Sequence, residues 1–349
     1  MSEIKRGYVR PLDIKQGCVD MSHGSGGRAM AQLIEELFAG AFANEYLGQN
    51  DDGAVLPAAA GRLVLSTDCH VVSPLFFPGG DIGCLSVHGT INDVAMMGAT
   101  PLYLTAGFIL EEGFPFAEMK RIIDSMACAS KEAGVPVVAG DTKVVERGHG
   151  DGVFITTTGL GFLPEGVNLS GNRARAGDRI LVSGTLGDHG MAIMAQRESL
   201  GFSSPIISDT AALHGLVAAL MKSGADVRTL RDPTRGGLAT TLNEIAQQSA
   251  VGMMLQEPAL PINREVAAAC ELLGLDPLYV ANEGKLVAIV ASDDAERALA
   301  ALRAHPLGSR AAIIGTVHED SHHFVQMTTG FGGRRIVDWL TGEQLPRIC

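Results

Sequence analysis

Hydrophobic and polar positions follow two different periods along the first half of the chain. Apolar residues recur at helical spacing over 82–99 and 116–134, and Gly134 ends the second stretch in the way typical of a helix. Around them lie runs rich in Val, Leu, Ile and Thr, which are typical of strands. The pattern therefore predicts one α/β domain. The predicted strands are 62–72, 101–110, 135–146 and 152–163.

A polar segment with glycine, LSGNRARAGD at 169–178, separates this domain from a second half of the same class. Such segments are typical of domain boundaries. Strand-like and helix-like stretches resume after it, without enough self-similarity to indicate a repeat. From about residue 333 the pattern weakens, which predicts a loose tail. The stretches of the second half are 179–184, 210–224, 236–250, 264–275, 285–291 and 295–304.

Composition and charge narrow the class of protein. The chain has 349 residues, 46% of them hydrophobic, which suits roughly two domains with full cores. The formal net charge of −12 argues against nucleic acid or an anionic membrane as a partner, because the summed field repels polyanions. A small anion such as a nucleotide is still compatible with a local site. The sequence shows neither a signal-peptide core nor an apolar run of membrane-spanning length, so we expect a cytoplasmic protein.

The last residue of the chain is a cysteine, Cys349. The other five cysteines are scattered without a C-x-x-C pair, as expected of packed or inert thiols in a reducing compartment. A chain end is usually the least ordered part of a domain. We therefore expect the Cys349 thiol to be exposed, mobile and open to chemistry. The ending is not a prenylation box, in which the cysteine is fourth from the end.

A glycine-rich stretch near the start, HGSGGRA at 23–29, fits the G-x-G-x-x-A pattern of dinucleotide-binding turns. The match is weak, because neither the preceding hydrophobic strand nor the later acidic residue of that pattern is clear. Gly26 and Gly27 precede a helix-like stretch and could present backbone N–H groups to a phosphate, or they form a flexible turn. No G-x-x-x-x-G-K-S/T motif occurs, which excludes a P-loop.

Acidic residues beside small polar ones recur at strand ends and loops of the first half. Taken singly, each aspartate is better explained as a turn or cap residue. Four such sites in one domain favour metal–nucleotide binding, since Mg²⁺ is usually held by a few carboxylates together with substrate phosphates. A metal between the carboxylates and a triphosphate also removes their mutual repulsion. The four sites contain Asp51 and Asp52, Thr67 and Asp68, Asn92 and Asp93, and Asp141, Thr142 and Lys143.

Loops of the second half carry further candidates. Arg235 in RDPTRGG could contact a phosphate, although capping of the following helix by Thr234 explains part of this motif equally well. Glu283 in ANEGK precedes an apolar strand, where a carboxylate could act as a general base or be a turn residue. His189 in SGTLGDHG is of a kind more often hydrogen-bonded for structure than catalytic.

Together these motifs resemble those of the HypE family of hydrogenase maturation factors, which belongs to the PurM-like ATP-using superfamily. The motifs that carry the resemblance are HGSGG, NDDGA, STD, GTINDVAMMGA, GDTKVV, SGTLGDHG, RDPTRGG, ANEGKLV and the ending PRIC. The terminal cysteine after Pro-Arg-Ile is the most specific of them. The resemblance implies an N-terminal extension at 1–20, a PurM-like ATP-binding domain at 21–170, a C-terminal PurM-like domain with a mixed sheet flanked by helices at 175–335, and a flexible tail at 336–349.

The resemblance also implies a reaction and partners. A HypF-like carbamoyltransferase would place a carbamoyl group on Cys349, and this chain would dehydrate the resulting thiocarboxamide to a thiocyanate with ATP and Mg²⁺. The cyano group would then pass to iron in a HypC–HypD complex during assembly of the nickel–iron hydrogenase centre. A homodimer is implied as well, with the N-terminal domains sharing a β-barrel.

The superfamily pattern implies a role for each candidate residue. ATP would first phosphorylate the amide oxygen, with Lys143 neutralising charge, and Glu283 would accept the nitrogen proton. Another PurM-like activity, of the selenophosphate synthetase or thiamine-monophosphate kinase type, leaves Cys349 unexplained. A non-catalytic scaffold in which ATP gates the docking of partners is a third possibility. The residues implied to bind metal and ATP are Asp52, Asp68, Asp93 and Asp141, with Asp51, Thr67, Asn92, Thr142, Gly26, Gly27 and Arg235 nearby.

Overall fold

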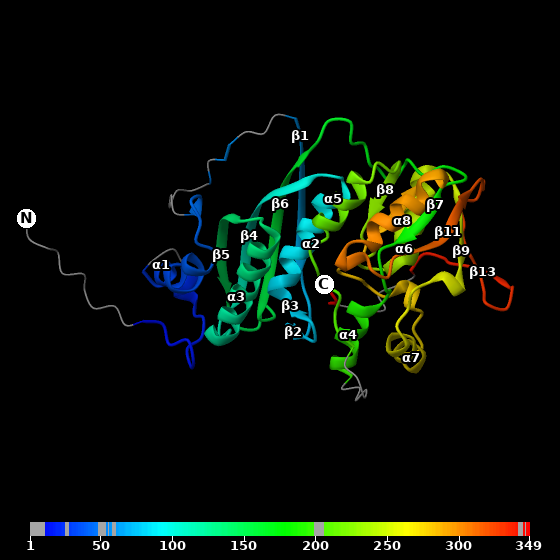
Figure 1. Ribbon diagram of the computed structural model, residues 1–349. Coiled ribbons are helices and arrows are strands. Elements are labelled where there is room, and N and C mark those ends of the chain that lie inside the picture. Colours follow the sequence, from blue (N-terminus) through cyan, green and yellow to red (C-terminus); the bar gives the residue numbers. More distant parts are fainter. Residues whose placement is uncertain are drawn as a thin grey trace, which may run out of the picture.

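The structure, a computed structural model, describes residues 11–24, 28–47, 54, 56–57, 61–198, 206–340, 345 and 347–349. Each half of the chain forms its own main sheet with its own helices, and the halves pack side by side (Figure 1). The predicted α/β class is therefore confirmed. No helix among these residues is long and apolar enough to cross a membrane. Four sequence-predicted site residues lie outside the described residues, namely Gly26, Gly27, Asp51 and Asp52.

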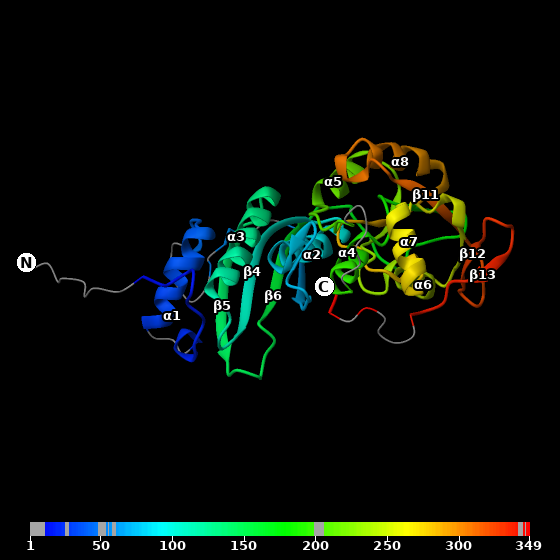
Figure 2. The ribbon, with the colours of Figure 1, turned by 90° about the horizontal axis from the view of Figure 1, so that it is seen from below.

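The sheet of the first half is covered by helices on one face only. Its elements are β1 Arg62–His70, β2 Phe76–Phe77, β3 Gly80–Asp81, α2 Ile82–Met96, β4 Thr100–Glu111, α3 Phe116–Ala133, β5 Val137–Val145 and β6 Val153–Leu163. The strand order is β1–β6–β4–β5, and only β4 and β5 are parallel. Ala106 and Phe108 of β4 are buried on the face that α2 and α3 cover (Figure 2). On the other face Leu63 and Leu65 of β1 are 57% and 70% exposed.

The sheet of the second half has helices on both faces. Its elements are β7 Arg179–Val182, α4 Asp188–Arg197, α5 His214–Lys222, β8 Val227–Arg231, α6 Gly237–Ser249, β9 Gly252–Gln256, α7 Arg264–Leu273, β10 Val287–Val290, α8 Ala295–Arg303, β11 Ala312–His318, β12 Val325–Thr328 and β13 Arg334–Ile336. The strand order is β13–β12–β9–β11–β7–β10–β8. Alternate side chains of β7 point to opposite faces. Ile180 and Val182 therefore pack with α6, whereas Leu181 packs with α5 and α8.

Two short helical segments precede the first sheet. α1 (Arg28–Leu33) continues directly into a π-helix at Ile34–Ala39. Both lie beside β5, on the side of the first sheet that faces away from the second half (Figures 1 and 2). Their buried residues Leu33 and Leu37 extend the core of the first half past its edge strand. Short 3-10 helices are Met21–Gly24, Glu257–Ala259, Pro277–Tyr279, Ser292–Asp294 and Pro306–Gly308.

Most predicted elements are present, with small shifts at their ends. α3 ends at Gly134, whose φ of 68° is the left-handed conformation that glycine adopts without strain. α6 begins after Gly236 and has no side-chain cap, so the predicted capping by Thr234 is wrong. The sequence pattern missed α4 and several short strands of the second sheet. The missed strands β9, β12 and β13 have only 5, 4 and 3 residues, which is too short to show a clear period of apolar and polar positions.

The two halves meet where α2 packs against the second half. Ala95 and Met96 of α2 join a buried cluster that contains Leu216 of α5 and Leu213 just before it. The chain crosses from the first sheet to the second within 164–178, which contains the predicted boundary segment. The end of the chain returns to this junction and lies near α2 and α4 in both views (Figures 1 and 2). The last residues therefore touch both halves.

Candidate active site

The last residues of the chain are docked on the first half. Ile348 forms an antiparallel bridge with Val72, and the Val71 amide donates to the Cys349 carbonyl oxygen over 3.1 Å. Ile348 is 3% exposed and belongs to the buried core cluster that contains Val72. Cys349 itself is half-buried. The expectation of an exposed terminal thiol is therefore wrong, because the tail adds a short strand-like segment to the first half.

Side chains of the second half hold the same segment. Nε2 of His189, in the first turn of α4, lies 2.8 Å from the Ile348 carbonyl oxygen. Arg197, the last residue of α4, donates to the carbonyl oxygens of Arg347 and Ser73. The Ser73 amide donates in turn to the Arg347 carbonyl oxygen over 3.1 Å. Both halves therefore fix the backbone of the tail just before the terminal thiol.

Glu283 lies against the terminal thiol. Its side chain is 4% exposed, and its Oε1 has no hydrogen-bond partner among the described residues. The carboxyl of Glu283 and the thiol of Cys349 are close enough to hydrogen-bond. The Glu283 amide donates to Oδ1 of Asp209 over 3.1 Å, and Asp209 forms an ion pair with Lys285 over 2.9 Å. This buried ion pair fixes the loop that carries Glu283.

Burial and negative charge control the protonation of this pair. Burial raises the pKa of the Glu283 carboxyl well above its ordinary value, and the charges of Asp232, Asp209 and Asp68 raise it further. Burial also raises the pKa of the Cys349 thiol, and the nearby Glu283 carboxylate adds to the effect. A thiol with a raised pKa stays protonated at neutral pH and is a poor nucleophile. The arrangement therefore suits proton transfer at Glu283 better than thiolate chemistry at Cys349.

Three aspartates, which we call the acidic cluster, lie beside Glu283: Asp68 on β1, Asp93 on α2 and Asp232 before α6. Burial, followed by the charge of Asp93, raises the pKa of Asp232 to about 7. Burial also raises the pKa of Asp93, although a hydrogen bond from Ser66 opposes this and the charge of Asp68 adds to it. Negative charges placed close together repel one another, and a bound cation reduces that repulsion.

The acidic cluster is not a complete metal site by itself. Within the described part of the chain, no three His, Cys, Asp or Glu side chains are placed to hold a metal ion together. The donor chemistry nevertheless fits Mg²⁺, which is often bound by one or two carboxylates and completed by water and substrate phosphates. Arg235 is exposed nearby, and its charge lowers the pKa of the Cys349 thiol. Thr67 lies on the open face of β1 and donates to the Thr157 carbonyl oxygen over 3.1 Å.

Asn92 links the two halves behind Glu283. It is 1% exposed, and its Nδ2 donates to the carbonyl oxygens of Ala211 over 3.0 Å and Glu283 over 3.2 Å. Its Oδ1 accepts from the Leu213 amide over 2.7 Å. These contacts all go to backbone groups, so they do not support the predicted contact of Asn92 with ATP. They instead hold the Glu283 loop against α2.

Asp141, Thr142 and Lys143 lie far from Glu283 within one chain. They are on β5, the edge strand opposite β1, which is three strand spacings and so roughly 14 Å away. Asp141 and Lys143 form an exposed ion pair of 3.1 Å on the open face of the sheet. Asp68 instead faces α2, since the Ser66 side chain two residues earlier hydrogen-bonds with Asp93 on α2. The predicted constellation of aspartates is therefore divided between two edges of the sheet.

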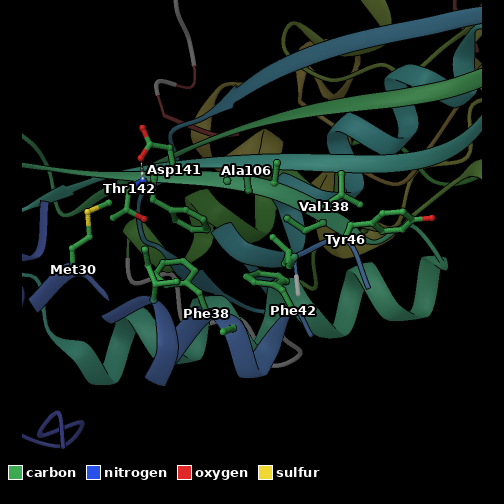
Figure 3. Close-up of a pocket in the computed structure, with 15 residues that line it drawn as sticks. Met30, Phe38, Phe42, Tyr46, Ala106, Val138, Asp141 and Thr142 are labelled. Carbon is green, nitrogen blue, oxygen red and sulfur yellow. Dashed lines mark hydrogen bonds between the residues drawn. The ribbon is translucent and has the colours of Figure 1, made fainter. Parts of the chain in front are cut away.

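A cavity of about 380 Å³ lies beside this second group, between α1 with the π-helix and the strands β4 and β5 (Figure 3). Phe38 and Phe42 point from the helical segment toward the sheet. Tyr46 is at one end of the cavity, and Asp141 and Thr142 are at the other. An apolar, aromatic cavity with polar groups at one end suits a flat ring that carries a polar substituent.

Sequence reasoning missed three residues of the site. Asp232 belongs to RDPTRGG, but only Arg235 was a candidate in that motif. Asp209 becomes significant only through its contacts with Lys285 and the Glu283 loop. His189 is in a recognised glycine-rich motif, yet a single histidine in a sequence gives no sign of its partner. All three depend on contacts between distant parts of the chain.

Comparison with known families agrees with this architecture. Residues 50–163 match the N-terminal domain of AIR synthase related proteins, and residues 175–328 match the C-terminal domain of the same class. The fold and the acidic site thus define a two-domain protein of the AIR synthase related class. The chain is 67% identical over 347 residues to carbamoyl dehydratase HypE of Cupriavidus necator, with 99% of each chain covered. It belongs to the HypE family, as its motifs predicted.

Solved structures give the same result. The crystal structure of hydrogenase maturation protein HypE in complex with ATP has a TM-score of 0.91 and 50% identity, covering 95% of this chain and 99% of that one. A chain in the crystal structure of a HypE–HypF complex has a TM-score of 0.78 and 52% identity, covering 88% of this chain and 99% of that one. ATP and HypF are therefore a ligand and a partner of relatives with this fold. The PurM-like fold and the enzyme class that the motifs imply are confirmed.

Proposed function

We propose that this protein is an ATP-dependent carbamoyl dehydratase that converts a thiocarboxamide on Cys349 to a thiocyanate. The observation that carries the proposal is the docking of the terminal thiol against the buried Glu283. The product would supply the cyano ligand of the nickel–iron hydrogenase centre. A selenophosphate synthetase or a thiamine-monophosphate kinase would have no use for a docked terminal thiol. The carbamoyl dehydratases that the chain resembles support the same choice.

The proposed reaction removes the elements of water from S–C(=O)–NH₂. The γ-phosphoryl group of ATP passes to the amide oxygen, forming a C–O–P bond and ADP. Both nitrogen protons then leave and the C–O bond breaks, which gives S–C≡N and phosphate. Glu283 lies beside the sulfur and is placed to accept a nitrogen proton. Burial raises the pKa of Glu283, which makes its ionised carboxylate a stronger proton acceptor than an exposed one.

The acidic cluster would hold Mg²⁺ and the phosphates of ATP. The charge of Asp68 raises the pKa of both Asp93 and Asp232, and the charge of Asp93 raises that of Asp232, so a cation among them would remove an existing repulsion. Bound Mg²⁺ supplies charge neutralisation and orientation for phosphoryl transfer. Asp51 and Asp52 stay predicted members of this site. Arg235, exposed beside the thiol, would contact a phosphate oxygen.

A homodimer would bring the divided residues together. The open face of the first sheet carries Leu63, Leu65 and Ile109, which are 57%, 70% and 44% exposed. The sheet ends in two edges, β1 and β5, and exposed edges favour pairing with another strand. Two copies that joined their sheets edge to edge would form a closed barrel and bury both open faces. This is the shared barrel that the family resemblance implies.

In that barrel β5 of one copy would lie beside β1 of the other. Asp141 and Lys143 of one copy would then approach Asp68 of its partner, which accounts for their distance from Glu283 within one chain. The cavity beside β5 would hold the adenine ring of ATP, with the phosphates directed across the edge to the acidic cluster. Lys143 would neutralise charge on the transferred phosphoryl group.

Mixed dimers test the shared site. Glu283→Gln and Asp141→Ala chains should each form little thiocyanate. A purified mixed dimer carrying both tags contains one site with an intact Glu283 from one chain and an intact Asp141 from the other. We expect about half of the wild-type rate from it, since one of two symmetric sites is restored. An inactive mixed dimer would reject the shared site. The same variants mixed without subunit exchange are the control.

The reaction itself is tested by measuring the mass of the C-terminal peptide. Wild-type protein incubated with a HypF-like carbamoyltransferase, carbamoyl phosphate and ATP should carry a thiocyanate on its C-terminal peptide. A thiocarboxamide that persists would reject the dehydratase activity. ATP turnover that does not depend on a loaded Cys349 would favour the scaffold instead. We further propose that a HypC–HypD complex receives the cyano group, while the cytoplasmic location stays a prediction.

A further inference from the structure

His189 occupies an unusual place in the molecule for a residue outside the reaction. It lies in the first turn of α4, belongs to the second half of the chain, and is fully buried. Its ring meets Phe77 edge-on, with 5.4 Å between the ring centres. Nδ1 lies 2.8 Å from Oγ of Ser208, and Nε2 lies 2.8 Å from the carbonyl oxygen of Ile348. Both ring nitrogens therefore have one polar partner each.

The chemistry of the two partners determines the state of the ring. A backbone carbonyl can only accept a hydrogen bond, so Nε2 must carry the proton that it donates to Ile348. Burial lowers the pKa of His189, which favours the neutral ring. Nδ1 is then without a proton and accepts from the hydroxyl of Ser208. In the docked state the ring is therefore the neutral tautomer with its proton on Nε2.

The other contacts of the tail explain why this bond matters. Backbone pairing with Val71 and Val72 holds the tail on the first half, but such pairing has no preference for one side chain over another. The bond from His189 reaches the tail from the second half, on the peptide that immediately precedes Cys349. Glu283 also belongs to the second half. Arg197 of the second half holds the tail one residue earlier, at the Arg347 carbonyl, whereas His189 holds the peptide next to the thiol-bearing residue.

We propose that His189 is a positioning residue that locks the docked tail through the Ile348 carbonyl and so holds Cys349 against Glu283. The consequence for the reaction rests on the proposed dehydratase function, whereas the docking does not. The partners of the His189 ring are Ser208, Phe77 and the Ile348 carbonyl, none of which takes part in the proposed reaction. Loss of its bond should release the tail without removing any group that takes part in the chemistry.

Alkylation of the thiols measures docking in the full-length protein without ATP or partners. The rate at which iodoacetamide modifies Cys349, followed by mass of the C-terminal peptide, is proportional to the undocked fraction of the tail. Cys18 is exposed and serves as the reference for reagent, and buried Cys270 is modified only on unfolding. In wild-type protein we expect Cys349 to react well below the rate of Cys18. Equal rates would overturn the docked tail itself.

Two substitutions of His189 distinguish the effect of losing its hydrogen bond to Ile348 from the effect of losing the volume of its ring. Glutamine places an N–H near the position of Nε2, whereas the shorter asparagine places its amide near Nδ1 and cannot reach the tail. His189→Asn should speed alkylation of Cys349 about tenfold, as expected for the loss of one net hydrogen bond. His189→Gln should stay within about threefold of wild type, because it keeps the donor. An unchanged rate in His189→Asn would overturn the proposal.

Two further variants test whether faster alkylation comes from the lost His189 bond or from a general destabilisation of the junction between the halves. His88 lies at the same junction, where its Nδ1 is 3.0 Å from Oγ1 of Thr210, and it makes no hydrogen bond with the described residues of the tail. His88→Asn should therefore leave Cys349 as protected as in wild type, and an equal acceleration would overturn the specific role of His189. Reactive Cys270 in His189→Asn would mean that this variant unfolds, and Ser208→Ala then takes its place as the test variant. Ser208→Ala removes the partner of Nδ1, so the proton of His189 is no longer kept on Nε2. Alkylation of Cys349 should therefore become severalfold faster.

Single-turnover measurements connect docking to the reaction. Carbamoyl loading needs the tail outside the site, so His189→Asn should load at least as fast as wild type. Conversion of the loaded group to thiocyanate should slow about tenfold, and His189→Gln should restore most of the rate. Slower conversion with unchanged alkylation would overturn positioning in favour of a chemical role. If wild-type protein forms no thiocyanate at all, the dehydratase function fails while the alkylation result still decides the docking.

Discussion

Replacement of Asn92 by alanine tests whether one side chain joins the two halves behind the active site. The substitution removes two bonds from Nδ2, to Ala211 and Glu283, and one bond that Oδ1 accepts from Leu213. Each buried backbone group left without a partner costs about 1–3 kcal/mol. The carbonyl of Ala211 is only partly buried, so water can replace its bond. Taking about 1.5 kcal/mol for each of the other two groups, we expect the free energy of unfolding to fall by about 3 kcal/mol.

Hydrogen exchange at the Leu213 amide reports this link directly. A loss of about 3 kcal/mol corresponds to opening of the amide roughly 100 times more often. Exchange monitored by mass spectrometry over the peptide that contains Leu213 should therefore accelerate by that factor in Asn92→Ala. Urea unfolding followed by circular dichroism gives the global value where both halves unfold in one transition.

Asn243 supplies a matched control. It is also a buried asparagine, and its Nδ2 donates to the carbonyl oxygens of Ala239 and Val337 over 2.9 Å each. Asn243→Ala should lower stability too, yet thiocyanate formation should be unchanged at temperatures where the protein stays folded. Asn92→Ala should slow it, because Glu283 loses an anchor. Wild-type protection of Leu213 in Asn92→Ala, or an equal loss of activity in both variants, would refute this reasoning.

Three further outcomes follow from the site. Asp232 has a folded-state pKa of about 7, above its ordinary 3.8, so its contribution to stability is present below about pH 4 and is lost as the pH rises through 7. With a chelator present, the free energy of unfolding of Asp232→Asn in urea should equal that of wild type at pH 4 and exceed it at pH 8. A difference that does not depend on pH would contradict this. Cys349→Ala should abolish carbamoyl loading and leave ATP affinity unchanged by calorimetry, whereas thiocyanate on another cysteine would show that the tail is not the carrier. One alanine added after Cys349 should crowd the buried site beside Glu283 and so increase the rate at which the thiol is alkylated. An unaltered rate would show that docking of the tail does not depend on where the chain ends.

Local patterns in the sequence were sufficient for much of the fold. The helix at 116–134 was predicted from apolar spacing and Gly134, both of which act within a few residues of one another. The long strands of the first sheet were predicted for the same reason. Short strands of the second sheet, such as β9 and β12, were missed because they have only 5 and 4 residues and pair with strands far along the chain.

The sequence by itself also determined the family and gave the candidates for the reactive residues. Glu283 and Cys349 were recognised from motifs, and motifs record chemistry that a residue type must supply wherever it lies. The acidic residues were recognised in the same way. Which of them act together was not contained in those motifs, since spacing along a chain says little about distance across a sheet.

Only the tertiary structure decided how these residues are grouped. Sheet register places Asp68 and Asp141 on opposite edges and opposite faces, although both belong to the same sheet. Packing of the tail between the two halves turns a terminal thiol that looked exposed into a half-buried one beside Glu283. It also gives His189 a partner 159 residues away. Such contacts form when distant surfaces meet and exclude water, and no local periodicity or propensity encodes which surfaces these are.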